Sequence, residues 1–272
     1  ESVGEDQRGT AFSLLSLTWF LPGFYSYLMA GFLAERYGDR LIVGILLATE
    51  IISFLIFALF VRETLKEKKP VDLRRIFANM REILRLAGGL GAFYALAILD
   101  GLSWSLIGGI FVGMLWKSFG FSRIQIGVLL NAFAVATALS LLPMGKLIDR
   151  YGSRRPLILS LSLFSLVFLG YFLSRGFYGF LLVQAVKGLA VALWDPSSRS
   201  YLSNSVPEAE RGKFFGCLAG LRGLVSFPAP VIGAFIFEAY GFRGAVSAGL
   251  LCSLAATAFS FKIRPLDKVF AQ

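Results

Sequence analysis

Residues 145–155 read Gly145-Lys146-Leu147-Ile148-Asp149-Arg150-Tyr151-Gly152-Ser153-Arg154-Arg155, a short charged segment between two apolar runs. The runs cover residues 127–144 and 157–173, and each has about the length that a membrane-spanning helix needs. Five charged side chains confined between two such runs indicate a tight loop at one face of a membrane. Within it, Gly145 would allow a neighbouring helix to approach closely, and Gly152 would allow a sharp turn.

The composition of the whole chain favours a membrane protein. Apolar residues make up 56% of the 272 residues, and 27 of them are Phe, more than a soluble domain of this size needs. The net charge of +10 comes from basic residues between apolar runs, which suits anionic lipid headgroups better than nucleic acid. The chain has no His, and its two Cys lie in apolar runs, so we expect no enzyme active site, cofactor or metal site.

Hydropathy divides the chain into eight candidate membrane spans, which predict an all-α membrane protein with eight transmembrane helices. The first contains Pro22-Gly23 near its middle, where we expect a kink. Residues 62–85, between the second and third spans, are polar and include a candidate amphipathic surface helix. The expected spans cover residues 9–34, 41–61, 90–116, 124–144, 156–173, 177–194, 214–237 and 244–261.

Basic residues are distributed unequally between the two sides of these spans. The N-terminus, the C-terminus and the loops 62–85, 146–155 and 199–213 fall on one side and carry 19 Lys and Arg, whereas the opposite side carries six. The positive-inside rule predicts that the first side is cytoplasmic. We therefore expect a multi-pass protein of the cell membrane, with both ends of this chain in the cytoplasm. Because the chain starts at Glu1 without Met or a leader, we also expect a longer N-terminal portion.

A repeat with a constant offset of 203 residues relates the two ends of the chain. It matches the first span to the seventh and the second to the eighth, as expected for parallel repeats of six helices. The matching residues are Arg8-Gly9 with Arg211-Gly212, Phe12 with Phe215, Glu35 with Glu238, Tyr37-Gly38 with Tyr240-Gly241, and Arg40 with Arg243.

The 145–155 segment resembles the G-x-x-x-D-R-x-G-R-R signature of the major facilitator superfamily, which lies between the second and third helices of each six-helix half. The matching residues are Gly145, Asp149, Arg150, Gly152, Arg154 and Arg155. The alternative interpretation is an ordinary positive-inside loop.

The resemblance implies a twelve-helix fold, in which these eight spans are the fifth to the twelfth. Residues 1–64 would hold the last two helices of the N-terminal bundle, residues 65–87 the cytoplasmic loop between bundles, and residues 88–272 the six-helix C-terminal bundle. Four helices and the first copy of the signature would be absent from this chain.

The resemblance also implies a cytoplasmic gate. In the family, the acid of each signature lies against the start of a helix in the opposite half and holds the cytoplasmic side shut. Here Asp149 would accept from the first N–H groups of the first span, near Gly9, and pair with Arg8. A conformation closed on that side should bring Asp149 within hydrogen-bond or salt-bridge reach of residues 8–12. The repeat equivalent, Arg211-Gly212, should find no such acid in this chain.

Several polar side chains lie inside the predicted spans, where a charge is costly and functional roles concentrate. Gln184, Lys187 and Asp195 share one face of the sixth span. We expect Asp195-Pro196 to mark a helix end, and Glu50 is a candidate proton carrier. The candidates for a substrate or proton pathway are Glu50, Asp100, Trp104, Asn131, Gln184, Lys187 and Arg222.

A structural alternative remains for the charged members of this set. Lys187 or Arg222 would pair with Asp100 or Asp195 for helix assembly alone, or Arg222 would extend towards the cytoplasm. The first prediction is that Asp100 and Lys187 face the same interior space.

The sequence favours secondary active transport of a small organic solute by alternating access, with efflux coupled to protons as one version. The partners would be the solute, the lipid bilayer and protons as the coupling ion, without nucleic acid. Drug antiporters of the family carry Gly-Pro-x-x-Gly-Gly in their fifth helix, and Leu21-Pro22-Gly23 followed by Tyr25-Ser26 departs from it. The alternatives are proton-coupled uptake of a metabolite and a membrane receptor or assembly subunit that keeps the fold without transporting.

Overall fold

A computed structural model describes residues 7–60 and 90–263, with residues 1–6, 61–89 and 264–272 outside the description. The expected surface helix and the loop 65–87 lie in the part that is not described. The described helices are α1 (Arg8–Phe20), α2 (Gly23–Tyr37), α3 (Asp39–Phe60), α5 (Gly91–Gly108), α6 (Phe111–Phe119), α7 (Arg123–Tyr151), α8 (Arg154–Leu173), α9 (Phe177–Asn204), the 3-10 helix η3 (Glu208–Glu210), α10 (Arg211–Ser226) and α11 (Ala229–Ser260).

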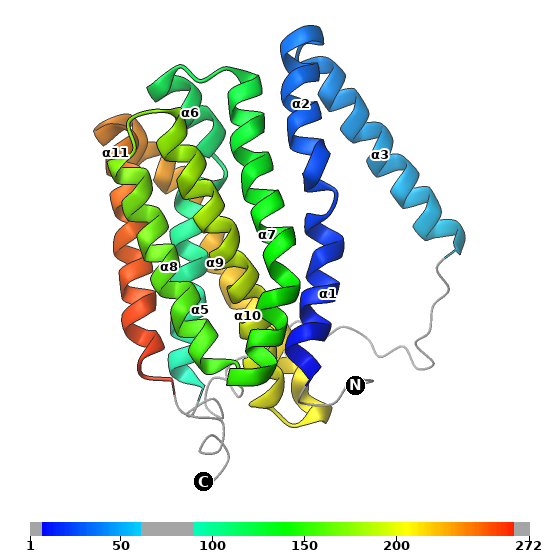
Figure 1. The fold of residues 1–272 in the computed structure, drawn as a ribbon, viewed down its shortest axis with the longest axis vertical. Coiled ribbons are helices and arrows are strands. Elements are labelled where there is room, and N and C mark those ends of the chain that lie inside the picture. Colours follow the sequence, from blue (N-terminus) through cyan, green and yellow to red (C-terminus); the bar gives the residue numbers. More distant parts are fainter. Residues whose placement is uncertain (1–6, 61–89, 264–272) are drawn as a thin grey trace.

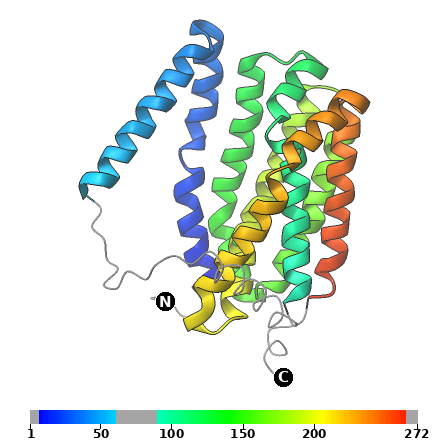
Figure 2. The same cartoon turned by 180° about the vertical axis from the view of Figure 1, so that it is seen from behind.

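The helices run side by side in one bundle, except α3, which leans away from it (Figures 1 and 2). Seven helical runs among the described residues are long and apolar enough to cross a membrane. The last run, Arg211–Ser260, has 50 residues and would measure about 75 Å if straight, more than twice the hydrocarbon thickness. It is broken at Gly241 and turns back there (Figure 2), so it makes two passes. The described residues thus form the expected all-α membrane fold with eight passes.

The bundle has two ends, which we call the Asp149 end and the Gly38 end. The Asp149 end, lower in Figure 1, is where α1, α5 and α10 begin and α7 ends; the Gly38 end lies opposite, at the turn between α2 and α3. The 203-residue repeat is visible in the backbone at the Gly38 end. Gly38 has φ 83° and Gly241 has φ 68°, a region that favours glycine, so the matched Tyr-Gly pairs make the same turn.

The expected kink in the first pass is confirmed. Leu21 and Pro22 separate α1 from α2. Asn131 of α7 contacts the first turn of α2 just after this break. Its Nδ2 donates to the carbonyl oxygens of Gly23 (3.0 Å) and Phe24 (2.6 Å).

Two expected boundaries are wrong, and one expected span is interrupted. The interruption is in the third pass, at Gly109 and Ile110 between α5 and α6. The charged signature is mostly helical, because α7 continues through Pro143 to Tyr151 while packing on α1, which leaves a turn of only Gly152-Ser153. Asp195-Pro196 does not end a helix: α9 continues to Asn204, since its final turns bury Tyr201 and Leu202 in the core.

Burial is unequal between the two ends of the chain. Helices α5 to α11 enclose two clusters of buried apolar residues. In contrast, α3 has no buried residue, and α1 and α2 bury only small residues on the side facing α7 and α9. These are Gly9, Ser13, Ser16, Gly23 and Gly31.

Helix α11 packs very closely against α5 at Gly233. A Cβ placed on Gly233 would stand 1.7 Å from the backbone carbonyl oxygen of Leu106, whereas one on Gly113 of α6 would meet nothing within 4 Å. We expect Gly233→Ala to lower the thermal unfolding midpoint of the detergent-solubilised protein, since forced separation of packed helices costs about 1–3 kcal/mol. The control Gly113→Ala should leave the midpoint unchanged or raise it, because Ala is the better helix former. Equal midpoints for the two variants would contradict the close approach.

Candidate functional site

The carboxylate of Asp149 lies against the start of α1. Its Oδ1 accepts from the Gly9 backbone N–H at 2.7 Å, and its Oδ2 accepts from the Thr10 backbone N–H at 3.0 Å and from Thr10 Oγ1 at 2.5 Å. The first N–H groups of a helix have no partner within it, and the helix dipole places partial positive charge there. Asp149 is therefore held by three donors within the expected range of residues 8–12.

The glycines of the signature make this contact possible. A Cβ on Gly145 would stand 2.5 Å from Ser13 Oγ, and one on Gly9 would stand 2.6 Å from Asp149 Oδ1. Gly152, with φ 76°, makes the turn into α8. Gly212 is the residue that corresponds to Gly9 in the repeat. A Cβ added to Gly212 would have no described atom within 4 Å, so none of the described carboxylates lies against Gly212 as Asp149 lies against Gly9.

We call the contact of Asp149 with the first N–H groups of α1 the Asp149 clasp, and several basic residues lie close to it in the sequence. Arg150 and Arg155 are exposed, and Arg154 is half-buried. The Arg8 guanidinium reaches α9, where its Nη1 donates to Asn204 Oδ1. Arg8 thus connects the start of α1 to the end of α9, a contact that the sequence did not predict.

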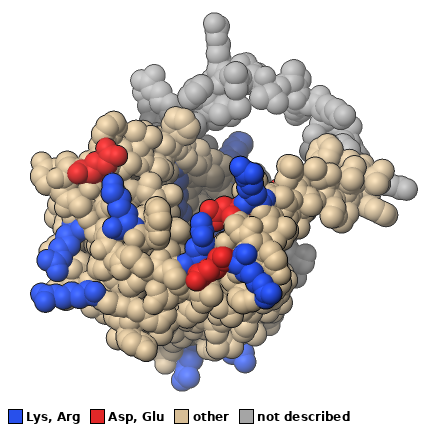
Figure 3. All heavy atoms as spheres, turned by 90° about the horizontal axis from the view of Figure 1, so that it is seen from above, with Lys and Arg blue, Asp and Glu red and all other residues tan. Residues whose placement is uncertain are grey.

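A second clasp, also missed by sequence reasoning, joins the same two segments at the Gly38 end. Near the end of α2, Glu35 Oε2 accepts from the Ile124 backbone N–H at 3.1 Å, in the first turn of α7. Next to it, Arg123 and Asp39 form an exposed ion pair at 2.8 Å. Acidic and basic side chains are interspersed on this face of the bundle (Figure 3). An acid near the end of each antiparallel segment therefore caps the start of the other.

A third contact between α1 and the large bundle lies deeper. Ser16 Oγ donates to Asp195 Oδ2, and Arg199 binds the other oxygen of the same carboxylate at 3.0 Å. Asp195 is thus bound from both sides.

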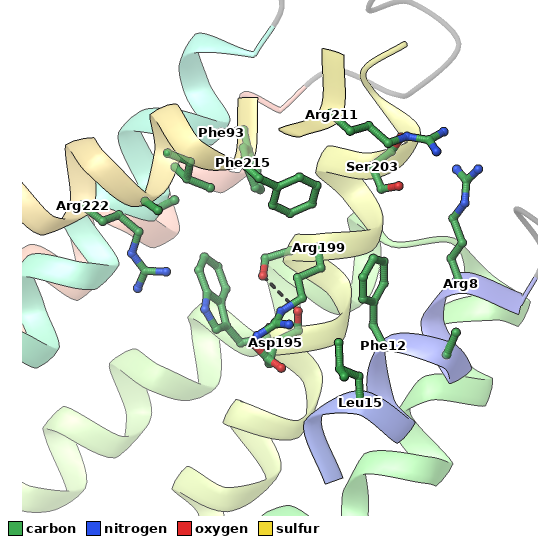
Figure 4. A pocket seen from close by; sticks show the side chains of 16 residues that line it. Arg8, Phe12, Leu15, Phe93, Asp195, Arg199, Ser203, Arg211, Phe215 and Arg222 are labelled. Atoms are coloured by element: carbon green, nitrogen blue, oxygen red, sulfur yellow. Dashed lines mark hydrogen bonds and ion pairs between the residues drawn. The ribbon is translucent and has the colours of Figure 1, made fainter. Parts of the chain in front are cut away.

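A cavity of about 680 Å³ opens beside this contact, between α1 on one side and α5, α9 and α10 on the other. Arg8 and Arg222 lie on opposite sides of it, with the Asp195–Arg199 pair between them (Figure 4). Arg211 and Arg222 are 11 residues apart on α10, so the cavity reaches about 16 Å into the bundle. Its aromatic lining consists of Phe12, Phe93, Trp194 and Phe215.

At the inner side of the cavity, Arg222 pairs with Asp100 of α5 at 3.1 Å. Asp100 is only 2% exposed, and Gly101 makes room for the guanidinium, because a Cβ there would stand 2.9 Å from Arg222 Nε. The structural pairing considered for these two residues is therefore present.

Lys187 lies in a cage of aromatic rings near the middle of α9. Its Nζ is 4.4 Å from the centroid of Trp104, 4.7 Å from that of Phe133 and 6.0 Å from that of Phe111. No ion pair or hydrogen bond reaches Lys187 from the described residues. A charge near the bilayer centre costs about 2.5–3.5 kcal/mol, and a cation–π contact returns about 0.5–2 kcal/mol, so the ammonium is only partly compensated.

Trp104 lies next to both the buried Asp100 and the half-buried Lys187. Its ring contacts Lys187, and its Nε1–H faces the Asp100 carboxylate without a hydrogen bond of normal geometry. Asp100 and Lys187 therefore adjoin the same indole. On α9, one turn before Lys187, the Gln184 side chain is fully buried, accepts from Tyr171 Oη at 2.9 Å, and has an Nε2 without a partner.

Two candidates stand apart from this group. Glu50 is exposed on α3, away from the other charged residues of the passes. Asn131 bonds to the backbone of the first turn of α2 and is not among the residues that line the cavity.

Comparison with known proteins identifies the family of this arrangement. The sequence profile of the Major Facilitator Superfamily matches residues 93–271, from α5 onwards. The chain belongs to the Major Facilitator Superfamily. The family indicates a transporter rather than an enzyme.

Its relatives include proteins named for drug resistance and export. Multidrug resistance protein MdtG of Salmonella arizonae is 25% identical over 256 residues, which are 92% of this chain and 63% of that protein. MdtG of Proteus mirabilis is 25% identical over 221 residues, 79% of this chain and 54% of that protein. The tetracenomycin C resistance and export protein of Streptomyces glaucescens is 26% identical over 126 residues, which are 46% of this chain and 23% of that protein. The chain spans less than two thirds of each relative.

We expect the two single substitutions in the Asp100–Arg222 pair to lower the stability of the protein by different amounts. Arg222→Gln should destabilise the protein more than Asp100→Asn, because the Asp100 side chain is 3% exposed and the Arg222 side chain 35%. Removing the partner of a buried charge costs about 3–5 kcal/mol, and less where water reaches the remaining group. The double variant should be more stable than Arg222→Gln alone in thermal unfolding in detergent. Strictly additive losses would show that the two side chains do not interact.

Proposed function

We propose that this chain is the main part of a secondary transporter that moves a small organic solute across the cytoplasmic membrane by alternating access. The observation that carries the proposal is the Asp149 clasp beside a cavity at the same end of the bundle. In this view α1 to α3 are the last helices of one bundle, and α5 to α11 form the other. The 203-residue repeat and the unequal burial support that division.

The two clasps give a physical basis for alternation. Each exists only while the α1–α2 segment and α7 touch at that end, because the acceptor and the donors belong to different bundles. A rocking motion that breaks the Asp149 contacts would widen the cavity towards the basic side, which we assign to the cytoplasm. The small residues between α1, α2 and α7 suit such a motion, since they leave few interlocked side chains.

Efflux is the direction that we propose. The names of the relatives mention resistance and export, and the cavity lies at the Asp149 end, where a cytoplasmic solute would enter once the clasp opens. Protons are the proposed coupling ion, with Asp100, Asp195 and Glu50 as the acids available for it.

We expect loss of the Asp149 clasp and loss of the Glu35 clasp to change cytoplasmic access to the cavity in different ways. In a cysteine-free background carrying Ser203→Cys as a reporter in the cavity, Asp149→Asn should increase labelling by an impermeant maleimide from the cytoplasmic side. Both carboxylate oxygens accept N–H bonds, and an amide retains only one acceptor. A loss of about 1 kcal/mol at a helix start corresponds to roughly fivefold in the open population.

Glu35→Gln is the matched control at the other end, and it should leave labelling of the same reporter unchanged or reduce it. Equal increases in both variants would show that the carboxylates support general stability and do not gate separate sides.

Transport itself is tested with the full-length protein in proteoliposomes and a panel of organic solutes. We expect saturable flux of at least one solute, faster when a pH gradient is imposed, and weaker in the Asp149→Asn variant because the closed state is less populated. Flux no greater than in empty liposomes across the panel would favour the receptor or assembly role.

A further inference from the structure

We propose that Lys187 and Gln184 of α9 bind the carboxylate, or an equivalent anionic group, of the transported solute. The aromatic rings around Lys187 would receive the apolar part of that solute. The proposal rests on the transport function above and deepens it by naming the class of solute: an organic anion with an apolar or aromatic body.

The first observation is a charge without a counter-ion. Among the cations within the described passes, Arg222 is paired with Asp100, whereas Lys187 touches only the faces of Trp104, Phe133 and Phe111. Aromatic faces weaken the need for a counter-ion without supplying hydrogen-bond acceptors. A half-buried ammonium with free N–H donors is therefore suited to an anionic acceptor.

The second observation is an unused donor next to it. Gln184 is three residues before Lys187, so the two side chains leave α9 on the same face. The Gln184 amide is 0% exposed, its Oε1 accepts from Tyr171, and its Nε2 has no acceptor. Buried donors of this kind are normally satisfied. Lys187 Nζ and Gln184 Nε2 would each supply an N–H donor to the carboxylate of the solute.

The position of the cluster suits a solute site between bundles. Phe133 of the cage packs edge-on against Phe20, with centroids 6.0 Å apart, just before the break between α1 and α2. Trp104 continues the aromatic surface to Phe168 at 4.7 Å and Phe164 at 5.3 Å. On α9, Lys187 precedes the cavity residue Trp194 by seven residues, about 10 Å along the helix.

The charge of the cavity supports the same solute class. Apart from Arg8, the charged residues of its described lining are Arg199, Arg211, Arg222 and Asp195. With Asp100 behind Arg222, one positive charge is in excess among these described residues, which would attract an anion from the Asp149 end. Asp100 and Asp195 are already bound by Arg222 and Arg199, so neither repels an anion as a free carboxylate would.

The test is a calorimetric titration of the full-length protein in nanodiscs with three matched probes: 3-phenylpropionate, its neutral amide and 3-phenylpropylamine. We expect the carboxylate to bind at least about tenfold more tightly than the amide, as one charge-assisted hydrogen bond allows, and the amine to bind least. Lys187→Met should remove the preference for the carboxylate over the amide, and Lys187→Arg should retain most of it. Lys117→Met is the control, because Lys117 also lies over a ring, Phe237, at 5.5 Å, but at the Gly38 end.

A second variant keeps the test decisive if Lys187→Met does not fold. Gln184→Glu supplies Lys187 with an internal counter-ion, so it should fold while abolishing carboxylate binding. Equal or tighter binding of the amine, no binding of the carboxylate to the unmodified protein, or unchanged carboxylate binding in Gln184→Glu would overturn the proposal. Transport of neutral or cationic solutes without carboxylate binding would reject this proposal alone, and carboxylate binding without any flux would reject transport alone.

Discussion

The arrangement of this protein depends on carboxylates that one segment places at the helix starts of the other. The first N–H groups of α1 and α7 lack partners within their own helices, and a carboxylate is a strong acceptor for them. Asp149 satisfies the start of α1, and Glu35 contributes to the start of α7 alongside the Ser122–Gln125 capping box. Because each acid comes from the opposite segment, these N–H groups of α1 and α7 gain their carboxylate acceptors only when the two segments are in contact.

This constraint explains why the contact can be both specific and reversible. The surface between α1, α2 and α7 consists largely of small residues whose backbones nearly touch, as at Gly31 and Gly127, where an added Cβ would stand 3.3 Å from the facing Cα. Such a surface has little interlocking, so much of its directional energy lies in a few charge-assisted hydrogen bonds at its ends. Breaking those at one end leaves the rest able to act as a hinge.

The charges inside the bundle are accommodated in three different ways. Asp100 and Asp195 are bound by arginines, Asp149 is bound by helix N–H groups, and Lys187 is surrounded by rings. The first two arrangements satisfy the charge with groups of the protein itself. The third leaves donors unused, and for that reason Lys187 is more informative about a missing ligand than the ion pairs are.

The sequence alone determined the membrane class, the eight passes and the kink at Pro22, because each depends on local hydropathy or proline chemistry. The place of Asp149 near Gly9 was implied by the resemblance of residues 145–155 to the family signature. Sequence reasoning misjudged the lengths of α7 and α9, since the apolar run ends before the helix when packing against α1 or the core continues to support it. Only the tertiary structure decided which charges pair, that Asn131 contacts the backbone of the first pass, and that Glu35 has a partner on α7. It alone showed that Lys187 meets rings from α5, α6 and α7. Whether side chains far apart in the sequence meet depends on how each helix is rotated and at what angle it crosses its neighbours. Packing between helices sets these angles, and the periodicity within one helix does not encode them.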